Sequence, residues 1–243
     1  MRKALISLLV LVAWAQKPKK GEKPSETTTP TPNPTPAQII YERAGKYMDP
    51  MTQIYALYWR IATEGASFSL LDTLAQLYFR AGLYQQAIAV TEDLIQEQPR
   101  HVESWEIRAL SYFYLQDTKK ALEAFEKLYE LTQAPQHLYQ VITLQFNLQR
   151  YGECQANIER LLSLPEAERT SVRITAPDGK TQEIPLKAAA LNVRGVLYRL
   201  QKEPEKAESA FKEALKVYPD FTLARGNLED LSRERSSPPP TKR

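Results

Sequence analysis

The sequence predicts an all-α protein built from pairs of short, packed helices. Only 8 of its 243 residues are glycine, and Leu, Ala, Glu, Gln and Lys, which favour helices, dominate the middle of the chain. Residues 188–219 carry apolar side chains at helical spacing in two segments, and residues 202–204 interrupt the pattern between them. A third observation is a spacing of 34 residues between similar side chains, which joins Leu71 to Trp105, Tyr78 to Tyr112 and Ala87 to Ala121.

The stretch from 188 to 219 shows how such a pair would pack. Gly195 and Ala207 leave room for the two helix axes to come close, and Tyr198 and Phe211 fill the space beside that contact. One pair cannot bury both of its faces. The stretch therefore predicts further helical pairs as neighbours.

This pattern resembles the tetratricopeptide repeat, a helix–turn–helix unit of 34 residues with small and aromatic residues at set positions. The residues that carry the resemblance in the stretch are Leu191, Gly195, Tyr198, Ala207, Phe211, Ala214 and Pro219. The resemblance implies a right-handed α-solenoid across residues 37–235, with repeats at about 68–101, 102–134, 135–165 and 188–219.

The third repeat is divergent, because its register is one residue short. Cys154 stands at its small interhelical position. We expect a buried, inert side chain there. The alternatives are a reactive thiol and an intermolecular bridge.

Both ends of the array are expected to differ from the regular repeats, since each has one face in water. Residues 37–65 form a degenerate helical pair, in which Asp49 caps the second helix and Pro50 precedes its first turn. Residues 221–234 form a capping helix that begins after Asp220, and residues 236–243 form a disordered tail.

The N-terminus reads as an export signal. A basic start, an apolar run and small residues at 13 and 15 predict a signal peptide over residues 1–15, cleaved near Ala15. The alternative is a membrane anchor, but the apolar run is shorter than the roughly 20 residues that span a bilayer. Residues 16–36 are rich in Pro and Thr and predict an extended linker, the alternative being a docking motif or a glycosylated stalk.

Residues 170–187 are an insertion between the third and fourth repeats. Val172, Ile174, Ile184 and Leu186 share one parity, which predicts a β-hairpin with one apolar face and a turn at 177–179. Its two interpretations are a structural brace and a specificity loop.

Charge and motifs exclude several functions. Residues 37–231 hold 22 basic and 26 acidic side chains, which argues against a nucleic-acid partner. His101 and His137 belong to no recognised catalytic or metal motif, and we expect both at the surface or at helix caps. The sequence therefore predicts no enzyme, no metal site, no cofactor and no stable membrane insertion.

Within the resembling family, the first helix of each repeat lines the concave surface, where partners bind. The side chains expected there are Asp72, Gln76, Phe79, Arg80, Glu106, Phe113, Tyr114, Tyr139, Thr143, Phe146, Asn147, Asn192 and Arg199. Phe113 and Phe146 have packing between helices as their alternative. The family's clamp for a C-terminal carboxylate uses Lys, Asn and Arg, and the matching positions here hold Asp72, Gln76, Ile107, Gln136 and Gln140.

We therefore expect an exported tetratricopeptide-repeat protein, periplasmic or extracellular, that acts as a non-catalytic scaffold. Its partner would be a peptide or a protein segment held on the concave surface. The alternative is a structural subunit of an envelope or secretion assembly that contacts its partners through the hairpin and the convex face.

Overall fold

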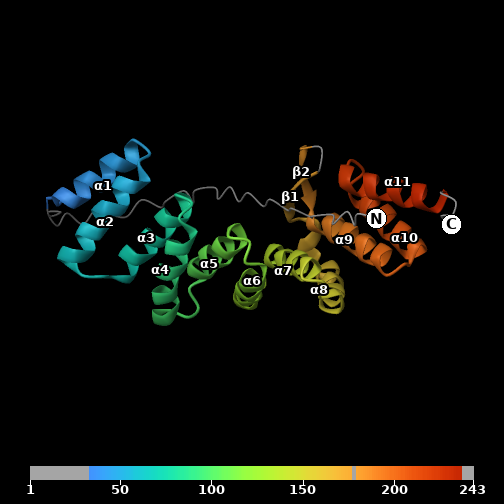
Figure 1. Cartoon of the computed structure of the whole chain (residues 1–243), viewed down its shortest axis with the longest axis horizontal. Helices are drawn as coiled ribbons and strands as arrows, with labels where there is room; N and C mark the ends of the chain where they lie inside the picture. Colours follow the sequence, from blue (N-terminus) through green and yellow to red (C-terminus); the bar gives the residue numbers. More distant parts are fainter. Residues whose placement is uncertain (1–32, 177–178, 237–243) are drawn as a thin grey trace, which may run out of the picture. The chain divides into compact units, whose positions relative to one another are not determined.

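A computed structural model describes residues 33–176 and 179–236, and the described part is largely helical (Figure 1). Its helices, in chain order, are α1 Pro36–Lys46, α2 Pro50–Glu64, α3 Phe68–Arg80, α4 Tyr84–Glu97, α5 Val102–Tyr114, α6 Thr118–Thr132, α7 Pro135–Asn147, α8 Tyr151–Ser163, α9 Leu186–Leu200, α10 Pro204–Val217 and α11 Thr222–Ser236. A 3-10 turn covers Pro165–Glu168, and two strands, β1 Ser171–Thr175 and β2 Thr181–Pro185, precede α9. The predicted all-α fold with a hairpin after the third repeat is confirmed.

The predicted signal peptide, the linker up to residue 32 and the tail from residue 237 lie outside the described residues. At the two edges the helices are longer than predicted. Pro36, placed in the linker, is the first residue of α1, and Ser236, placed in the tail, is the last residue of α11.

Local sequence signals set where the helices begin. The Thr35 hydroxyl and the Gln38 side chain form a reciprocal capping box at the start of α1. Asp49 caps α2 as predicted, because its Oδ1 accepts from the Thr52 N–H at 3.1 Å, and Pro50 occupies the first turn. The turns inside the repeats use a left-handed residue, which is glycine at Gly82 and glutamine at Gln116 and Gln149.

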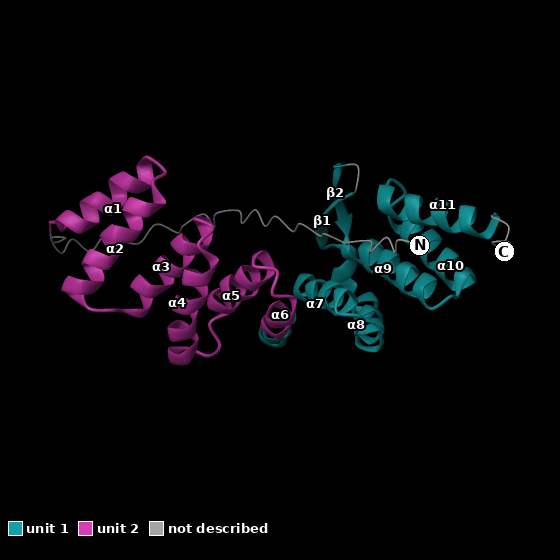
Figure 2. Ribbon diagram, viewed as in Figure 1, with its two compact units in different colours: residues 1–13, 125–243 teal, residues 14–124 magenta. Residues whose placement is uncertain are grey.

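The described chain divides into two compact units, whose boundary falls inside α6 (Figure 2). We call residues 33–124 the N-terminal unit and residues 125–236 the C-terminal unit. In the N-terminal unit α3 packs on α4 and α5, and α2 packs on α1 and α3. Its core includes Ala75 and Ala87, which are fully buried, as the small positions of a repeat should be.

The C-terminal unit packs α9 against α8, α10 and α11. Gly195 of α9 lies directly against the ring of the fully buried Phe211 of α10. The predicted close approach of these two helices is therefore present. Cys154 is also fully buried, as expected, and its thiol lies 3.5 Å from the Ile142 carbonyl oxygen.

The hairpin has the predicted parity. Val172 pairs with Ile184 and Ile174 pairs with Gln182 in an antiparallel register, and Val172, Ile174 and Ile184 are buried in the main cluster of the C-terminal unit. Leu186 shares that cluster but belongs to α9, because the helix starts directly after Pro185. Two of the three predicted turn residues lie outside the described residues, and Gly179 has the positive φ of 82° that a tight turn requires.

Gln182 ties the hairpin to the start of α11. Its Nε2 donates to the Asp220 carbonyl oxygen at 2.7 Å, while its Oε1 accepts from the Thr222 N–H at 3.0 Å and from the Thr222 hydroxyl at 2.6 Å. The sequence predicts only Asp220 as a cap for this helix. The hairpin therefore holds a helix terminus as well as covering apolar surface, which are the properties of a brace.

Candidate functional site

Helix α3 places four of the predicted binding residues on one side, because Asp72, Gln76, Phe79 and Arg80 are spaced by three or four residues or by a single step. Gln76 and Arg80 are exposed, while Asp72 and Phe79 are half-buried. The Gln76 Nε2 donates to Asp72 Oδ2 at 2.9 Å, and the Arg80 Nε donates to the Gln76 carbonyl oxygen at 3.4 Å. These bonds hold the polar side chains along the helix.

Four rings gather where α3 and α5 end and α4 begins, and we call Phe79, Tyr84, Phe113 and Tyr114 the aromatic cluster. Tyr84 and Tyr114 stack at 5.0 Å between ring centroids with 13° between their planes. Phe79 lies 5.7 Å from Tyr84 and 6.0 Å from Tyr114, and Phe113 meets Tyr114 edge-on at 5.8 Å. Tyr114 remains 38% exposed, so the cluster offers a rigid aromatic surface to a partner.

The sequence prediction missed Tyr84, because it considered only the first helix of each repeat. A usable signal exists five residues after Phe79. The pair Phe79 and Tyr84 recurs as Phe146 and Tyr151, whose centroids are 5.9 Å apart. An aromatic residue at the end of a first helix thus meets another at the start of the second.

The other end of this face, near the starts of α3 and α5, is acidic. Burial raises the pKa of Asp72, against the opposing effects of nearby His101 and of the Gln76 hydrogen bond. Burial, followed by the charge of Glu103, raises the pKa of Glu106. The Asp72 Oδ1 is buried and has no hydrogen-bond partner among the described residues. Two carboxylates are therefore partly desolvated at this end.

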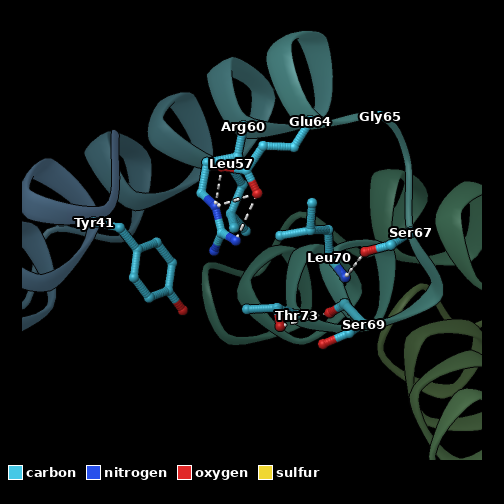
Figure 3. Close-up of a pocket in the computed structure, with 9 residues that line it drawn as sticks. All are labelled: Tyr41, Leu57, Arg60, Glu64, Gly65, Ser67, Ser69, Leu70 and Thr73. Carbon is cyan, nitrogen blue, oxygen red and sulfur yellow. Dashed lines mark hydrogen bonds and ion pairs between the residues drawn. The ribbon is translucent and has the colours of Figure 1, made fainter. Parts of the chain in front are cut away.

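A pocket of about 400 Å³ lies nearby, where α2 leads into α3 (Figure 3). The polar groups around it bond within the chain: Arg60 pairs with Glu64 at 2.9 Å, Ser67 accepts from the Leu70 N–H, and Thr73 donates to the Ser69 carbonyl oxygen. The pocket is thus a crevice at a helix junction. Its wall is formed by Tyr41, Leu57, Arg60, Glu64, Gly65, Ser67, Ser69, Leu70 and Thr73.

Three predicted binding residues of the C-terminal unit are buried, and the prediction for them is corrected. Tyr139 is 1% exposed, Thr143 4% and Asn192 2%. The Thr143 hydroxyl donates to the Gln140 carbonyl oxygen at 2.9 Å, and Asn192 Oδ1 accepts from Asn227 Nδ2 at 2.8 Å.

The physical reason is additional packing in this unit. Residues 137–145 of α7 are all buried, so that the helix has no open side there. Tyr139 shares one hydrophobic cluster with the hairpin residues Val172 and Ile174, and α11 covers the side of α9 that carries Asn192.

The remaining predicted residues of this unit are engaged within it or isolated. Phe146 is half-buried against the core and the Tyr151 ring, which is the packing alternative. Arg199 forms a two-pronged ion pair with Glu234 of α11, whose Nε–Oε2 distance is 3.1 Å. Asn147 is exposed.

The two histidines differ from the expectation. His137 is buried, its Nδ1 lies 2.8 Å from the Thr132 hydroxyl, and burial lowers its pKa to about 4. His101 is partly buried, and its Nδ1 lies 2.8 Å from the Ser104 hydroxyl. Within the described residues, no three acidic, His or Cys side chains come together as a metal site would need. No helix in this part of the chain has the length and apolar character to cross a membrane.

Comparison with known proteins places the repeats in a family. Residues 188–221 match the family model of the tetratricopeptide repeat, and residues 57–128 match the model described as anaphase-promoting complex, cyclosome, subunit 3. A search of curated proteins gives no match.

Several solved structures have a similar fold. A tetratricopeptide repeat protein from Parabacteroides merdae is 18% identical and covers 81% of this chain and 71% of its own length, with a TM-score of 0.60. YrrB, described as a TPR protein with an unusual peptide-binding site, is 14% identical, covers 81% and 92%, and also has a TM-score of 0.60. MamA is 15% identical, covers 74% and 89%, and has a TM-score of 0.58. Together with the paired helices and the family-model matches, these likenesses show that the chain belongs to the tetratricopeptide-repeat family.

Proposed function

We propose that the protein is a non-catalytic scaffold of the cell envelope that binds an extended peptide, or an extended segment of a partner protein, on the open side of α3 and α5. The observation that carries the proposal is the exposed aromatic cluster on the same side as the two partly desolvated carboxylates. The fold is that of a protein-interaction scaffold, and the similar fold of YrrB, a TPR protein with a peptide-binding site, supports this use of it.

The chemistry of the surface suggests the kind of peptide. Stacked tyrosine rings are rigid and amphipathic, so they favour an aromatic or aliphatic side chain laid against them. Asp72 and Glu106 favour a lysine or arginine at the other end, because a cation there compensates the charge that burial destabilises. Exposed Arg80, between these ends and the cluster, has guanidinium hydrogens to offer a peptide carbonyl.

The main rival is attachment through the hairpin. Its apolar face is already buried and Gln182 is committed to α11, so a partner would have only its polar face. We therefore favour the side of α3 and α5.

The binding proposal is tested with a library of random twelve-residue peptides displayed on phage. Selected peptides are synthesised with a fluorescent label and titrated by polarisation against the protein, against the double variant Phe79→Ala with Tyr114→Ala, and against Phe146→Ala as a matched loss of a half-buried ring elsewhere. Loss of two anchor rings should weaken binding by at least about 30-fold, and the control by less than about threefold. Equal binding by the double variant would show that the aromatic cluster is not the site.

The envelope location rests on the predicted signal peptide over residues 1–15. Expression in a bacterial host, followed by fractionation and mass spectrometry of the N-terminus, tests it. A mature chain beginning near Gln16 outside the cytoplasm is expected, and a chain that keeps Met1 in the cytoplasm would refute the location without touching the binding proposal.

A further inference from the structure

Helix α2 is apolar on every side, although one side faces outward. Its inner side is buried, with Ile54, Ala56 and Leu57 each 1–2% exposed. Its two charged residues, Arg60 and Glu64, bond to each other beside the pocket between α2 and α3 (Figure 3). A helix that is apolar all round is normally enclosed by protein.

The outward side carries a row of large apolar side chains. Met51, Tyr55 and Trp59, spaced by four residues, are 43%, 67% and 48% exposed, and Met48 in the turn before them is 88% exposed. Tyr58, beside the row, is fixed by a hydrogen bond between its hydroxyl and that of Tyr78. We call Met48, Met51, Tyr55, Tyr58 and Trp59 the outer face of α2.

The concentration of apolar surface here sets the face apart from the rest of the described chain. Of the eleven large apolar side chains that are exposed within residues 33–176 and 179–236, eight lie between Ile39 and Trp59. With Tyr47 included, the outer face exposes on the order of 700 Å² of apolar side chain, since each aromatic ring offers roughly 150–250 Å². Monomeric proteins rarely expose a continuous apolar patch above a few hundred Å².

We infer that a second copy of this chain covers the outer face of α2, with the two α2 helices packed antiparallel about a twofold axis. The spacing supports this occupant, because residues four apart form the ridge that interdigitates when two helices pack. With Tyr55 at the axis, Met51 of each copy meets Trp59 of the other. A thioether against an indole ring is a favourable contact, so the row is complementary to itself.

Charge and area support the same occupant. Along α2 the outer face has no charged side chain, and the Arg60–Glu64 pair is neutral as a unit, so two copies meet without repulsion along the helix. A partner selected by charge would find no complement there, whereas interfaces between identical chains are the more apolar class. The area is close to the roughly 800 Å² per partner of a stable interface. This face is separate from the peptide surface on α3 and α5, and the inference does not depend on that proposal.

The first test is the mass of the full chain in solution. Light scattering after size exclusion, between about 1 and 100 µM, should give a dimer. Tyr55→Glu should weaken the dimer by at least about 30-fold, because it buries a charge at the axis. Leu200→Glu, which changes a side chain that is 51% exposed in the C-terminal unit, should leave the dimer unchanged. A monomer throughout this range, or a Tyr55→Glu chain that dimerises as tightly as the parent, would overturn the inference.

A crosslink tests the geometry in a protein that keeps its apolar face. Under mild oxidation Tyr55→Cys should form a disulfide-linked dimer, because the axis places the residue against its own copy. Ala62→Cys, on the same exposed side two turns further along α2, should not. The natural Cys154 is fully buried and does not compete. If Tyr55→Cys fails to crosslink, or Ala62→Cys crosslinks as readily, the antiparallel arrangement is wrong.

Discussion

Substituting alanine for Gly195 is expected to destabilise the C-terminal unit, although alanine normally stabilises a helix. A Cβ atom at this position would lie 2.4, 2.6 and 2.9 Å from three ring carbons of Phe211. Carbon atoms in contact prefer about 3.5–4.0 Å, so the ring must move by about 1 Å. Phe211 is 0% exposed and has no free space to move into. Overpacking of this kind costs about 1–3 kcal/mol, while the gain in helix propensity is about 0.5–1 kcal/mol. We expect a net loss of about 1–2 kcal/mol.

Urea unfolding followed by circular dichroism measures the effect, and Gly226→Ala is the matched control. Gly226 also lies inside a helix of this unit, but a Cβ there meets nothing within 4 Å. The control should therefore gain about 0.5–1 kcal/mol from propensity alone. Adding Phe211→Leu to Gly195→Ala should make the two changes strongly non-additive, because the smaller side chain relieves the overlap. If Gly195→Ala is as stable as Gly226→Ala, the close approach of α9 and α10 is wrong.

Three further measurements test other parts of the structure. Gln182→Ala should cost about 1–3 kcal/mol and speed hydrogen exchange at the Thr222 N–H, because it removes three hydrogen bonds between the hairpin and α11. Slow exchange that persists would contradict the brace. Burial raises the pKa of the Cys154 thiol to about 12, so a disulfide reagent at pH 8 should react with it only after urea is added, and rapid reaction of the folded chain would contradict its burial. Burial lowers the pKa of His137 to about 4 against an ordinary 6.5, so the unfolded chain takes up the proton first. Stability should then fall as the pH drops from 6.5 towards 4, by about 2 kcal/mol at pH 5. His137→Gln should remove that part of the slope, and an unchanged slope would refute the assignment.

The repeat spacing predicts the buried small residues well. Positions 34 residues apart must meet the same neighbours when repeats stack, so Ala87 and Ala121 are both fully buried, and the offset from Tyr151 places Cys154 in the equivalent small site. The parity of the hairpin is also readable, because alternation in a strand is local. These features depend on short-range geometry that the sequence carries directly.

Features that depend on contacts far apart in the chain are not readable in this way. The burial of Asn192 depends on Asn227, 35 residues later, and the Thr222 N–H is bonded by a side chain 40 residues earlier. His137 looks like a boundary residue in the sequence, and it is buried because α7 is enclosed on all sides. Neither periodicity nor composition indicates which helix will be covered.

The same repeat position therefore has different consequences in the two units. Asp72 and Gln76 of α3 occupy the offsets that Tyr139 and Thr143 occupy in α7. The first pair keeps access to solvent, and the second is enclosed in the cluster to which the hairpin contributes. A large aromatic ring at an enclosed offset stabilises the core, whereas a carboxylate there would be desolvated without a partner. The residue types agree with these environments. The insertion and α11 thus act on binding by removing surface from the C-terminal unit, and of the predicted positions it is mainly those on α3 and α5 that remain available to a partner.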